Sequence, residues 1–265
     1  MNLAGQRTLL TGATGGLGRA IAGALADRGA RLVLSSRKGE ELEALASALP
    51  GDDHRAAVCD LAEEGAALRL LEEAGELDVL VANAGLPASG KLDDFSQEEI
   101  GRALRVNLES PVRMARALVP AMESRGHGHL VFVSSISGYA STPRASLYAA
   151  TKFGLRGFAL CLRDDLRGGP VGVSVISPGA VREAGMFADS RAKPPPALGT
   201  ATPEQVASAV VSAIERDRGE IRVAPLRQRA LGKIGMVAPE LSARVAGRKA
   251  TEVADEIARG QADKR

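Results

Sequence analysis

Tyr148 and Lys152, a tyrosine and a lysine four residues apart, are the residues of this sequence best suited to moving a proton. They lie near the start of a predicted helix, where this spacing puts both side chains on one face. A phenol has an ordinary pKa of about 10, and a neighbouring ammonium lowers that pKa by favouring the phenolate. The pair therefore predicts general acid–base chemistry on an alcohol or a ketone. Without supporting context, the same spacing more often marks a surface pair.

A glycine-rich turn gives the second chemical signal. Thr11 closes a predicted strand, residues 12–18 read G-A-T-G-G-L-G, and a predicted helix follows. Glycines let the backbone turn tightly and approach a pyrophosphate, and the N–H groups at a helix N-terminus bind anions. The spacing T-G-x-x-x-G-x-G differs from the general dinucleotide fingerprint G-x-G-x-x-G. A nucleotide loop is therefore indicated, with a purely structural turn as the alternative.

Alternating strands and helices must position these residues. Short, almost continuously apolar runs are typical of strands buried on both faces of a parallel sheet. The predicted strands are Thr8–Thr11, Arg31–Ser35, Arg55–Cys59, Asp78–Ala82, His129–Ser134, Val171–Ile176 and Ile221–Ala224. The predicted helices are Leu17–Arg28, Glu40–Leu49, Glu63–Ala74, Gln97–Arg125, Leu147–Leu166 and Pro203–Arg216. This order predicts the α/β class, as a single Rossmann-type doubly wound parallel sheet of about seven strands with helices on both faces.

The loop spacing resembles that of the short-chain dehydrogenase/reductase (SDR) family, and further motifs follow in the family's order. Asp60-Leu61 ends the third strand, Asn83-Ala84-Gly85 the fourth, and Pro178-Gly179 the sixth, so the match runs from about residue 5 to residue 225. The resemblance implies a dinucleotide cofactor and a set of residues that hold it. These are Gly12, Thr14, Gly16, Leu17, Gly18, Arg37, Asp60, Leu61, Asn83, Ala84, Gly85, Tyr148, Lys152, Pro178, Gly179 and Val181.

The end of the second strand predicts which nucleotide is used. An acidic residue there binds the ribose hydroxyls of NAD, whereas an arginine accommodates the extra phosphate of NADP. Ser36 stands at the place of the acidic residue, and Arg37 and Lys38 follow it. A guanidinium binds a phosphate in bidentate fashion, and no carboxylate is expected there to repel it. We therefore expect NADP(H) to be favoured over NAD(H). The alternative is that Arg37 is a solvated charge.

The resemblance also implies a catalytic set of Asn107, Ser135, Tyr148 and Lys152. The hydroxyl of Ser135 would polarise a substrate carbonyl, and strand alternation would turn Ser134 to the other face. Asn107 lies inside the predicted long helix, where an asparagine tends to disturb the helix and free a carbonyl that holds a water near Lys152. Lys152 would also hold the ribose of the nicotinamide half.

One position departs from the family pattern. The family often has a threonine shortly after its Pro-Gly pair, bonded to the nicotinamide carboxamide, and this sequence has Glu183 there. We expect the backbone around Val181 to hold the carboxamide instead. The departure leaves the placement of the lid and the facial geometry of hydride transfer open.

Residues 182–202 are long for a connection and read as a lid over the active site. Apolar residues in and near this segment favour a lipophilic carbonyl or secondary alcohol over a sugar phosphate as substrate. Packing of the lid alone is the alternative explanation. The residues concerned are Met186, Phe187, Leu198, Ile136 and Tyr139.

The chain divides into residues 1–225, the dinucleotide-binding and catalytic part, and residues 226–265, a C-terminal helical extension. Pro239 and Gly247 are expected to break this extension into short helices. Its basic and apolar residues are interleaved: Arg227, Arg229, Lys233, Arg244, Arg248 and Lys249 with Leu231, Ile234, Met236, Val237 and Leu241. Such a segment could lie on an anionic membrane. Packing on the domain or on a subunit partner is favoured.

Bulk composition excludes several classes of protein. With 34 basic and 32 acidic residues, 3% aromatics and no tryptophan, nucleic acid is not an expected partner. No secretory signal is visible, so a cytoplasmic location is expected. The cysteines Cys59 and Cys161 read as buried free thiols. The three histidines form no ligand cluster in the sequence, so no metal is expected.

Together these observations predict an NADP(H)-dependent oxidoreductase of the SDR type that interconverts a carbonyl, preferably a lipophilic ketone or aldehyde, and its alcohol. The alternative is a catalytically silent protein that senses NADP(H) on the same fold. A lyase or isomerase is a third, less favoured hypothesis. The resemblance also implies a homodimer or homotetramer formed through the helices Gln97–Arg125 and Leu147–Leu166.

Overall fold

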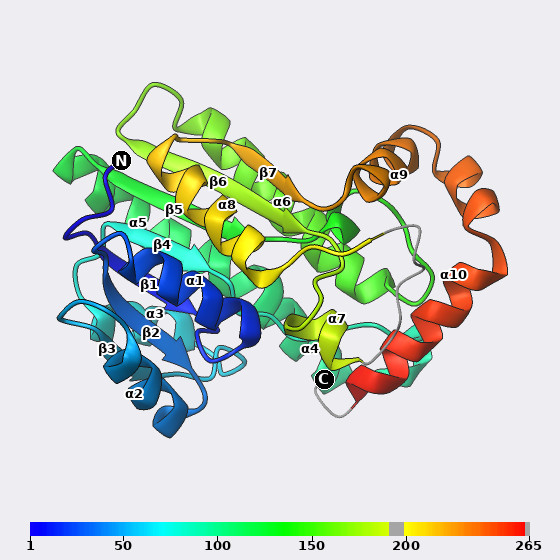
Figure 1. Ribbon diagram of the computed structural model, residues 1–265, viewed down its shortest axis with the longest axis horizontal. Helices are drawn as coiled ribbons and strands as arrows, with labels where there is room; N and C mark the ends of the chain where they lie inside the picture. The colour runs from blue at the N-terminus through cyan, green and yellow to red at the C-terminus, as the bar shows by residue number, and fades with distance from the viewer. Residues whose placement is uncertain (191–198, 263–265) are drawn as a thin grey trace.

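The computed structural model describes residues 1–190 and 199–262, with the side chains of residues 189, 239 and 241–250 left aside (Figure 1). Seven parallel strands form one sheet in the order β3-β2-β1-β4-β5-β6-β7. The strands are β1 (Arg7–Thr11), β2 (Arg31–Ser36), β3 (Arg55–Val58), β4 (Val79–Ala82), β5 (Gly128–Val133), β6 (Val171–Pro178) and β7 (Glu220–Val223). The predicted doubly wound sheet of about seven strands is confirmed. Its strand order reverses between β1 and β4, the place where such sheets bind ligands beyond their carboxyl ends.

Helices cover both faces of the sheet because each face is almost wholly apolar. The helices are α1 (Gly16–Ala26), α2 (Gly39–Ala48), α3 (Ala66–Ala74), α4 (Gln97–Leu104), α5 (Ser110–Arg125), α6 (Ser146–Asp165), α7 (Gly185–Asp189), α8 (Pro203–Glu215), α9 (Leu226–Val237) and α10 (Pro239–Gln261). One core layer packs α1, α2 and α8 on the sheet, and the other packs α3, α5 and α6. Figure 1 shows the two layers on either side of the central strands.

Several predicted bounds were wrong. Most strand and helix ends differ by one or two residues, but α3 begins at Ala66 instead of Glu63 because Gly65, at a φ of 71°, precedes it in a left-handed conformation. The long helix predicted at Gln97–Arg125 is divided. A π-helical turn at Arg105–Glu109 separates α4 from α5.

The segment after β6 forms the predicted lid region only in part within the described residues. Its two stems are joined by a bridge between Val181 and Ala201, and α7 follows the first stem. Residues 191–198, including Leu198, lie outside the described part of the chain.

Two helices make up the C-terminal extension, and only one of the two predicted breaks occurs. Pro239 starts α10 at its first turn, where the missing N–H of proline is tolerated. Gly247 lies within α10 and does not interrupt it, so that prediction was wrong. Along the described residues, no helix combines the length and apolarity needed to cross a membrane. Cys161 is exposed and Cys59 half-buried, so the prediction that both thiols are buried was also wrong.

Candidate active site

The glycine loop lies at the carboxyl ends of β1 and β4, where two main-chain segments approach closely. Gly12 has a φ of 67°, and a Cβ there would stand 2.9 Å from the Cα of Ala84. The Asn83 amide donates to the carbonyls of Thr11 and Gly12 at 3.0 and 3.2 Å. Main-chain N–H groups of Asn83 and Ala84 donate to the Thr11 hydroxyl. The Asn-Ala-Gly motif therefore supports the shape of the glycine loop.

The start of α1 is suited to an anionic group. A Cβ on Gly18 would collide with the Gly12 carbonyl oxygen, so only glycine lets α1 begin this close to the loop. The helix begins after Gly15 with no side-chain cap, which leaves its first N–H groups for a ligand. Ala184 packs against Gly16, and Leu17 lies next to Gly185, so the lid stem passes directly over this loop. This cradle fits the pyrophosphate of a dinucleotide.

The end of β2 carries the residues predicted to choose between NAD and NADP. The Thr14 hydroxyl donates to Ser36 at 3.0 Å, which ties the glycine loop to β2. Arg37 is exposed, but Asp60 lies 3.9 Å from its guanidinium. The expectation that no carboxylate stands near Arg37 was therefore wrong: Asp60, at the end of β3, is brought beside it by the pairing of β2 with β3. Leu61 follows Asp60 and is buried in the core.

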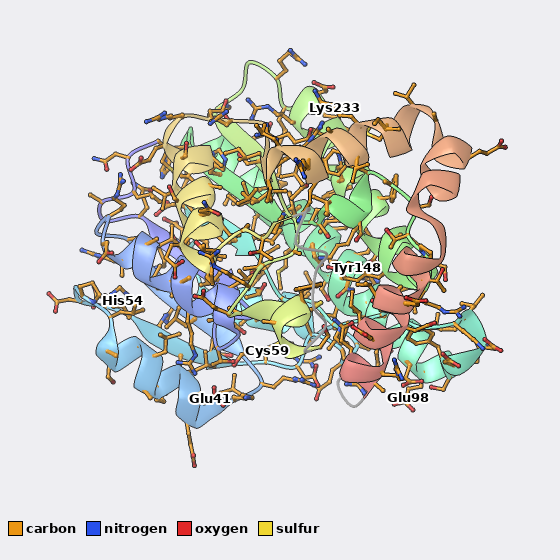
Figure 2. The ribbon with its side chains drawn as sticks, turned by 45° about the vertical axis from the view of Figure 1, so that its right-hand side comes forward. Glu41, His54, Cys59, Glu98, Tyr148 and Lys233 are labelled. Atoms are coloured by element: carbon orange, nitrogen blue, oxygen red, sulfur yellow. The ribbon has the colours of Figure 1, made fainter. Side chains whose placement is uncertain are left out.

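No sequence pattern predicted two further charged residues, Arg19 and Glu41, that lie near the glycine loop and the end of β2. Arg19 donates to the Thr14 carbonyl at 3.0 Å and to Glu41 at 2.7 Å. Lys38 donates to the same carboxylate at 2.7 Å. Figure 2 labels Glu41, on α2, at the lower left of the view. Glu41 thus offsets the positive charge around the loop, and no pattern in the sequence pairs it with Arg19.

The two serines at the end of β5 have different partners. The Ser135 hydroxyl accepts from the Ser137 N–H at 3.1 Å and lies close enough to Tyr148 to lower the tyrosine pKa. The Ser134 hydroxyl instead donates to the carbonyl of Lys152 at 3.0 Å. Ser134 therefore fixes α6 to β5, and Ser135 faces the tyrosine (Figure 2 labels Tyr148).

Asn107 lies in the π-helical turn between α4 and α5 and is fully buried. Its amide accepts from the Leu86 N–H at 2.7 Å and donates to the Leu86 carbonyl at 3.0 Å. It also lies 3.4 Å from the Thr151 hydroxyl on α6. The side chain thus joins the segment after β4 to α6. A π-helical turn of this kind widens the helix and is frequent at functional sites.

Lys152 is 3% exposed, and its ammonium donates to the Val133 carbonyl at 3.0 Å. Burial lowers the pKa of Lys152 to about 8, because the charged form loses water. Its Nζ lies 5.7 Å from the centre of the Tyr148 ring. A Cβ built on Gly85 would stand 3.4 Å from Asn107 Oδ1 and 3.8 Å from Lys152 Nζ, so the Asn83-Ala84-Gly85 motif ends beside two of the residues predicted to be catalytic.

The pKa of Tyr148 differs from the expectation drawn from Lys152. Burial raises the pKa of Tyr148 to about 12, and the nearby Ser135 side chain opposes this only in part. Loss of water therefore outweighs any favourable effect of the protein's own charges on the phenolate. Tyr148 is therefore protonated and neutral at neutral pH.

Tyr139 does not line an apolar cleft as expected. It is 2% exposed and lies between two guanidinium groups, with Arg156 at 4.1 Å and Arg222 at 4.4 Å from its ring centre. Its hydroxyl donates to Ser177 at 3.3 Å. Glu220 pairs with both arginines, at 2.7 and 3.2 Å. This cluster anchors the loop that carries Ser135 to β6, β7 and α6.

Two glutamines in the C-terminal extension hold the lid region, and no sequence pattern predicted either of them. Gln228 on α9 donates to the Gly199 carbonyl at 2.7 Å and accepts from the Ala180 N–H at 3.4 Å. Gln261 at the end of α10 donates to the Met186 carbonyl at 2.8 Å. The extension therefore touches both ends of the segment that follows Pro178-Gly179.

The arrangement of histidines, cysteines and carboxylates does not build a metal site among the described residues, since no group of three or more of them comes together there. His129 lies within β5, is 2% exposed and bonds to Ser174 at 2.8 Å. Burial lowers the pKa of His129 to about 4. It is a neutral core residue.

Comparison with known proteins identifies the family of the chain. Residues 6–195 match the family model described as short chain dehydrogenase. The chain belongs to this family. The resemblance drawn from its motifs is thereby confirmed, and the chain is placed among oxidoreductases that act on small molecules.

Individual relatives extend the comparison. The ketoacyl reductase HetN from Nostoc sp. is 35% identical over 227 residues, which span 83% of this chain and 79% of HetN. A 3-ketoacyl-(acyl-carrier-protein) reductase from Brucella melitensis, solved with NADH, is 25% identical with a TM-score of 0.75 over 85% of this chain and 99% of that one. A metagenomic short-chain oxidoreductase solved with NADP is 33% identical with a TM-score of 0.69 over the same shares. Family members similar to this chain thus bind NAD or NADP.

Proposed function

We propose that this protein is a cytoplasmic NADP(H)-dependent oxidoreductase that interconverts a lipophilic ketone or aldehyde and its alcohol. One observation carries the proposal. Ser135 is close enough to Tyr148 to lower its pKa, and the buried Lys152 has its Nζ 5.7 Å from the centre of the tyrosine ring, at the carboxyl ends of the strands. This is the place where a parallel sheet of this kind binds its nucleotide.

The chemistry follows from the protonation of these side chains. When bound, the nicotinamide supplies a hydride to the substrate carbon or takes it back. Tyr148, with a pKa of about 12, keeps its proton at neutral pH and donates it to the carbonyl oxygen as the C–H bond forms. Ser135 donates a hydrogen bond to the same oxygen and stabilises its developing negative charge. One hydride and one proton then convert the carbonyl to the alcohol.

Lys152 and Asn107 support the proton donor. Lys152 is the residue expected to bind the ribose of the nicotinamide half, since its Nζ lies beside Gly85 and within reach of the cleft. Binding of ribose hydroxyls to this ammonium would replace part of the water that it loses on burial. Asn107, bonded to Leu86 and Thr151, keeps Gly85 and α6 at a fixed separation. A water-linked proton relay through Asn107 and Lys152 to the tyrosine remains part of the proposal.

The preference for NADP(H) over NAD(H) depends on Arg37. Ser36 provides no carboxylate for the ribose hydroxyls, and Arg37 lies exposed beside it with Lys38 next along the chain. Asp60 offsets part of the Arg37 charge at 3.9 Å, which weakens this preference without removing it. Relatives solved with NADH and with NADP both exist, so the preference is measured by comparing the two nucleotides in one assay.

A lipophilic substrate is supported by apolar residues near Gly85 and Ser135. Met186 reaches Gly85, where a Cβ would stand 3.1 Å from its terminal methyl. Two further apolar side chains are half-buried: Phe187, which follows Met186, and Ile136, which follows Ser135. The relatives named ketoacyl reductases suggest 3-ketoacyl esters as members of the substrate panel.

A homodimer or homotetramer through α4–α5 and α6 is proposed for the assembly. Phe153 on α6 and Leu104 on α4 are exposed apolar side chains on these helices. Burial of such residues against a second copy would give the interface an apolar centre.

The proposed function is tested by NADPH consumption with a panel of ketones, aldehydes and 3-ketoacyl esters. Tyr148→Phe should lower turnover by roughly 10²-fold or more while nucleotide binding is kept. Tyr139→Phe changes the other tyrosine of the chain and is the matched control, expected to keep most of the activity. Undiminished turnover by Tyr148→Phe would show that the proton donor is wrong. Tight NADPH binding without turnover on any substrate would favour the sensing alternative.

A further inference from the structure

Helix α9 exposes an unusual share of apolar surface. Five of the ten large apolar side chains that are exposed in the described part of the chain lie on this 12-residue helix. Leu226 is 79% and Val237 87% exposed, and Leu231, Ile234 and Met236 accompany them. An exposed apolar patch of this density marks a surface that contacts a membrane or another molecule.

The apolar side chains are arranged as a stripe. At 100° per residue, Leu226, Ile234 and Val237 fall within about 80° of one another around the helix axis. Gln228 and Gly235, on roughly the opposite side, are buried. One side of α9 therefore packs on the protein, and the other presents apolar side chains outward.

Positive charge accompanies this stripe. Arg227, Arg229 and Lys233 are the charged residues of α9, which has no acidic residue. Residues 226–250 hold six basic residues and one acidic residue, a net charge of +5 in a chain of net charge +2, so the remainder carries −3. Basic residues flanking an apolar face are typical of helices that lie in the plane of an anionic membrane.

This charge argues against a second copy as the occupant. In a two-fold symmetric dimer the same patch meets itself, so three basic residues of one α9 would face three of the other. Like charges at the centre of an interface oppose association. The headgroups of anionic lipids complement the same charges.

The position of α9 connects this surface to the active site. Through Gln228, the buried side of the helix holds the stems of the lid region at Ala180 and Gly199. Figure 2 labels Lys233, a residue of α9, at the top of the view and Tyr148 near its centre. Helix α9 therefore connects its exposed stripe, on one side, to the lid stems, on the other.

We propose that α9 docks this protein on the surface of an anionic lipid membrane. The stripe of Leu226, Ile234 and Val237 enters the boundary between headgroups and acyl chains, and Arg229 and Lys233 bind the lipid phosphates. Docking in this orientation leaves Gln228, and the lid stems it holds, on the side of α9 that faces away from the bilayer.

The test is sedimentation of the full chain with vesicles of phosphatidylcholine alone or with phosphatidylglycerol added. Wild type should bind the anionic vesicles, and binding should weaken as salt is raised. Val237→Asp and Leu226→Asp should each weaken it roughly tenfold or more, because a charge replaces an inserted apolar side chain. The double variant Arg229→Gln/Lys233→Gln should weaken it by a similar factor, about fivefold for each charge.

Matched controls change exposed residues away from α9. Leu92→Asp alters an apolar side chain that is 61% exposed, and Arg167→Gln/Arg216→Gln removes two exposed charges; both should bind vesicles as wild type does. Absence of binding to anionic vesicles, or binding that the α9 variants leave unchanged, would overturn the proposal. Self-association of wild type that Val237→Asp abolishes, without vesicle binding, would assign the stripe to a second copy instead. These outcomes do not depend on turnover and are separable from the proposed activity.

Discussion

Replacing Lys152 by methionine should change the stability of the fold in a pH-dependent way while abolishing activity. The side chain is 3% exposed, and burial lowers its pKa to about 8. The unfolded chain keeps the ordinary lysine pKa of about 10.4. The folded protein therefore binds fewer protons at this residue than the unfolded chain does between these values. Its stability is reduced below pH 8, and this reduction disappears as the pH rises above the unfolded value.

The size of the effect follows from the two pKa values. A difference of about 2.5 units between the unfolded and folded pKa of Lys152 corresponds to about 3 kcal/mol of destabilisation at pH 7, and to about 1.4 kcal/mol at pH 9.5. Methionine removes the ammonium but also leaves the Val133 carbonyl without its hydrogen bond, an opposing effect of about 1 to 3 kcal/mol that does not vary with pH. The stability of Lys152→Met relative to wild type should thus fall by about 2 kcal/mol between pH 7 and pH 9.5.

Urea unfolding of both proteins without nucleotide, at pH 7 and at pH 9.5, measures this difference. Lys233→Met removes one exposed positive charge and is the matched control for charge alone. NADPH consumption by Lys152→Met should be lost at both pH values. A stability difference that stays constant, or that grows with pH, would refute the reasoning that burial disfavours this ammonium.

Two further predictions follow from the same structure. Gly18→Ala should weaken NADPH binding at least tenfold in a fluorescence titration, because the new Cβ would collide with the Gly12 carbonyl. The control is Gly23→Ala in the same helix, where a Cβ meets no atom within 4 Å. This control should raise the stability of the fold by about 0.5 to 1 kcal/mol and leave nucleotide binding unchanged. His129→Gln should remove the acid sensitivity that this residue gives to the fold. Burial lowers the pKa of His129 to about 4, so lowering the pH from 7 to 4 should cost wild type up to about 3 kcal/mol of stability relative to the variant. An equal loss of stability in both proteins would contradict this.

The sequence determined the order of elements and the residues that can do chemistry. Almost continuously apolar runs are read directly as buried parallel strands, because helices must cover both faces of such a sheet. The glycine loop and the Asn83-Ala84-Gly85 motif act through short stretches of backbone, so their positions could be predicted from spacing. The opposite directions of Ser134 and Ser135 follow from strand alternation in the same way.

Tertiary structure decided properties that depend on residues far apart in the chain. Asn107 bonds to Leu86 and divides a helix that the sequence pattern shows as continuous. Tyr139 looks like a cleft residue by type, yet Arg156 and Arg222 close around its ring.

The pKa of Tyr148 and the role of the C-terminal extension were decided in the same way. A helical spacing of four predicts that Lys152 lowers the tyrosine pKa, but packing removes water from both groups and raises it. Likewise, composition shows that residues 226–237 are basic and apolar, whereas only the folded chain shows which side of α9 is buried by Gln228. Periodicity reports local geometry, while burial and charge pairing arise from contacts between distant segments, which is why the motifs could be predicted and their electrostatics could not.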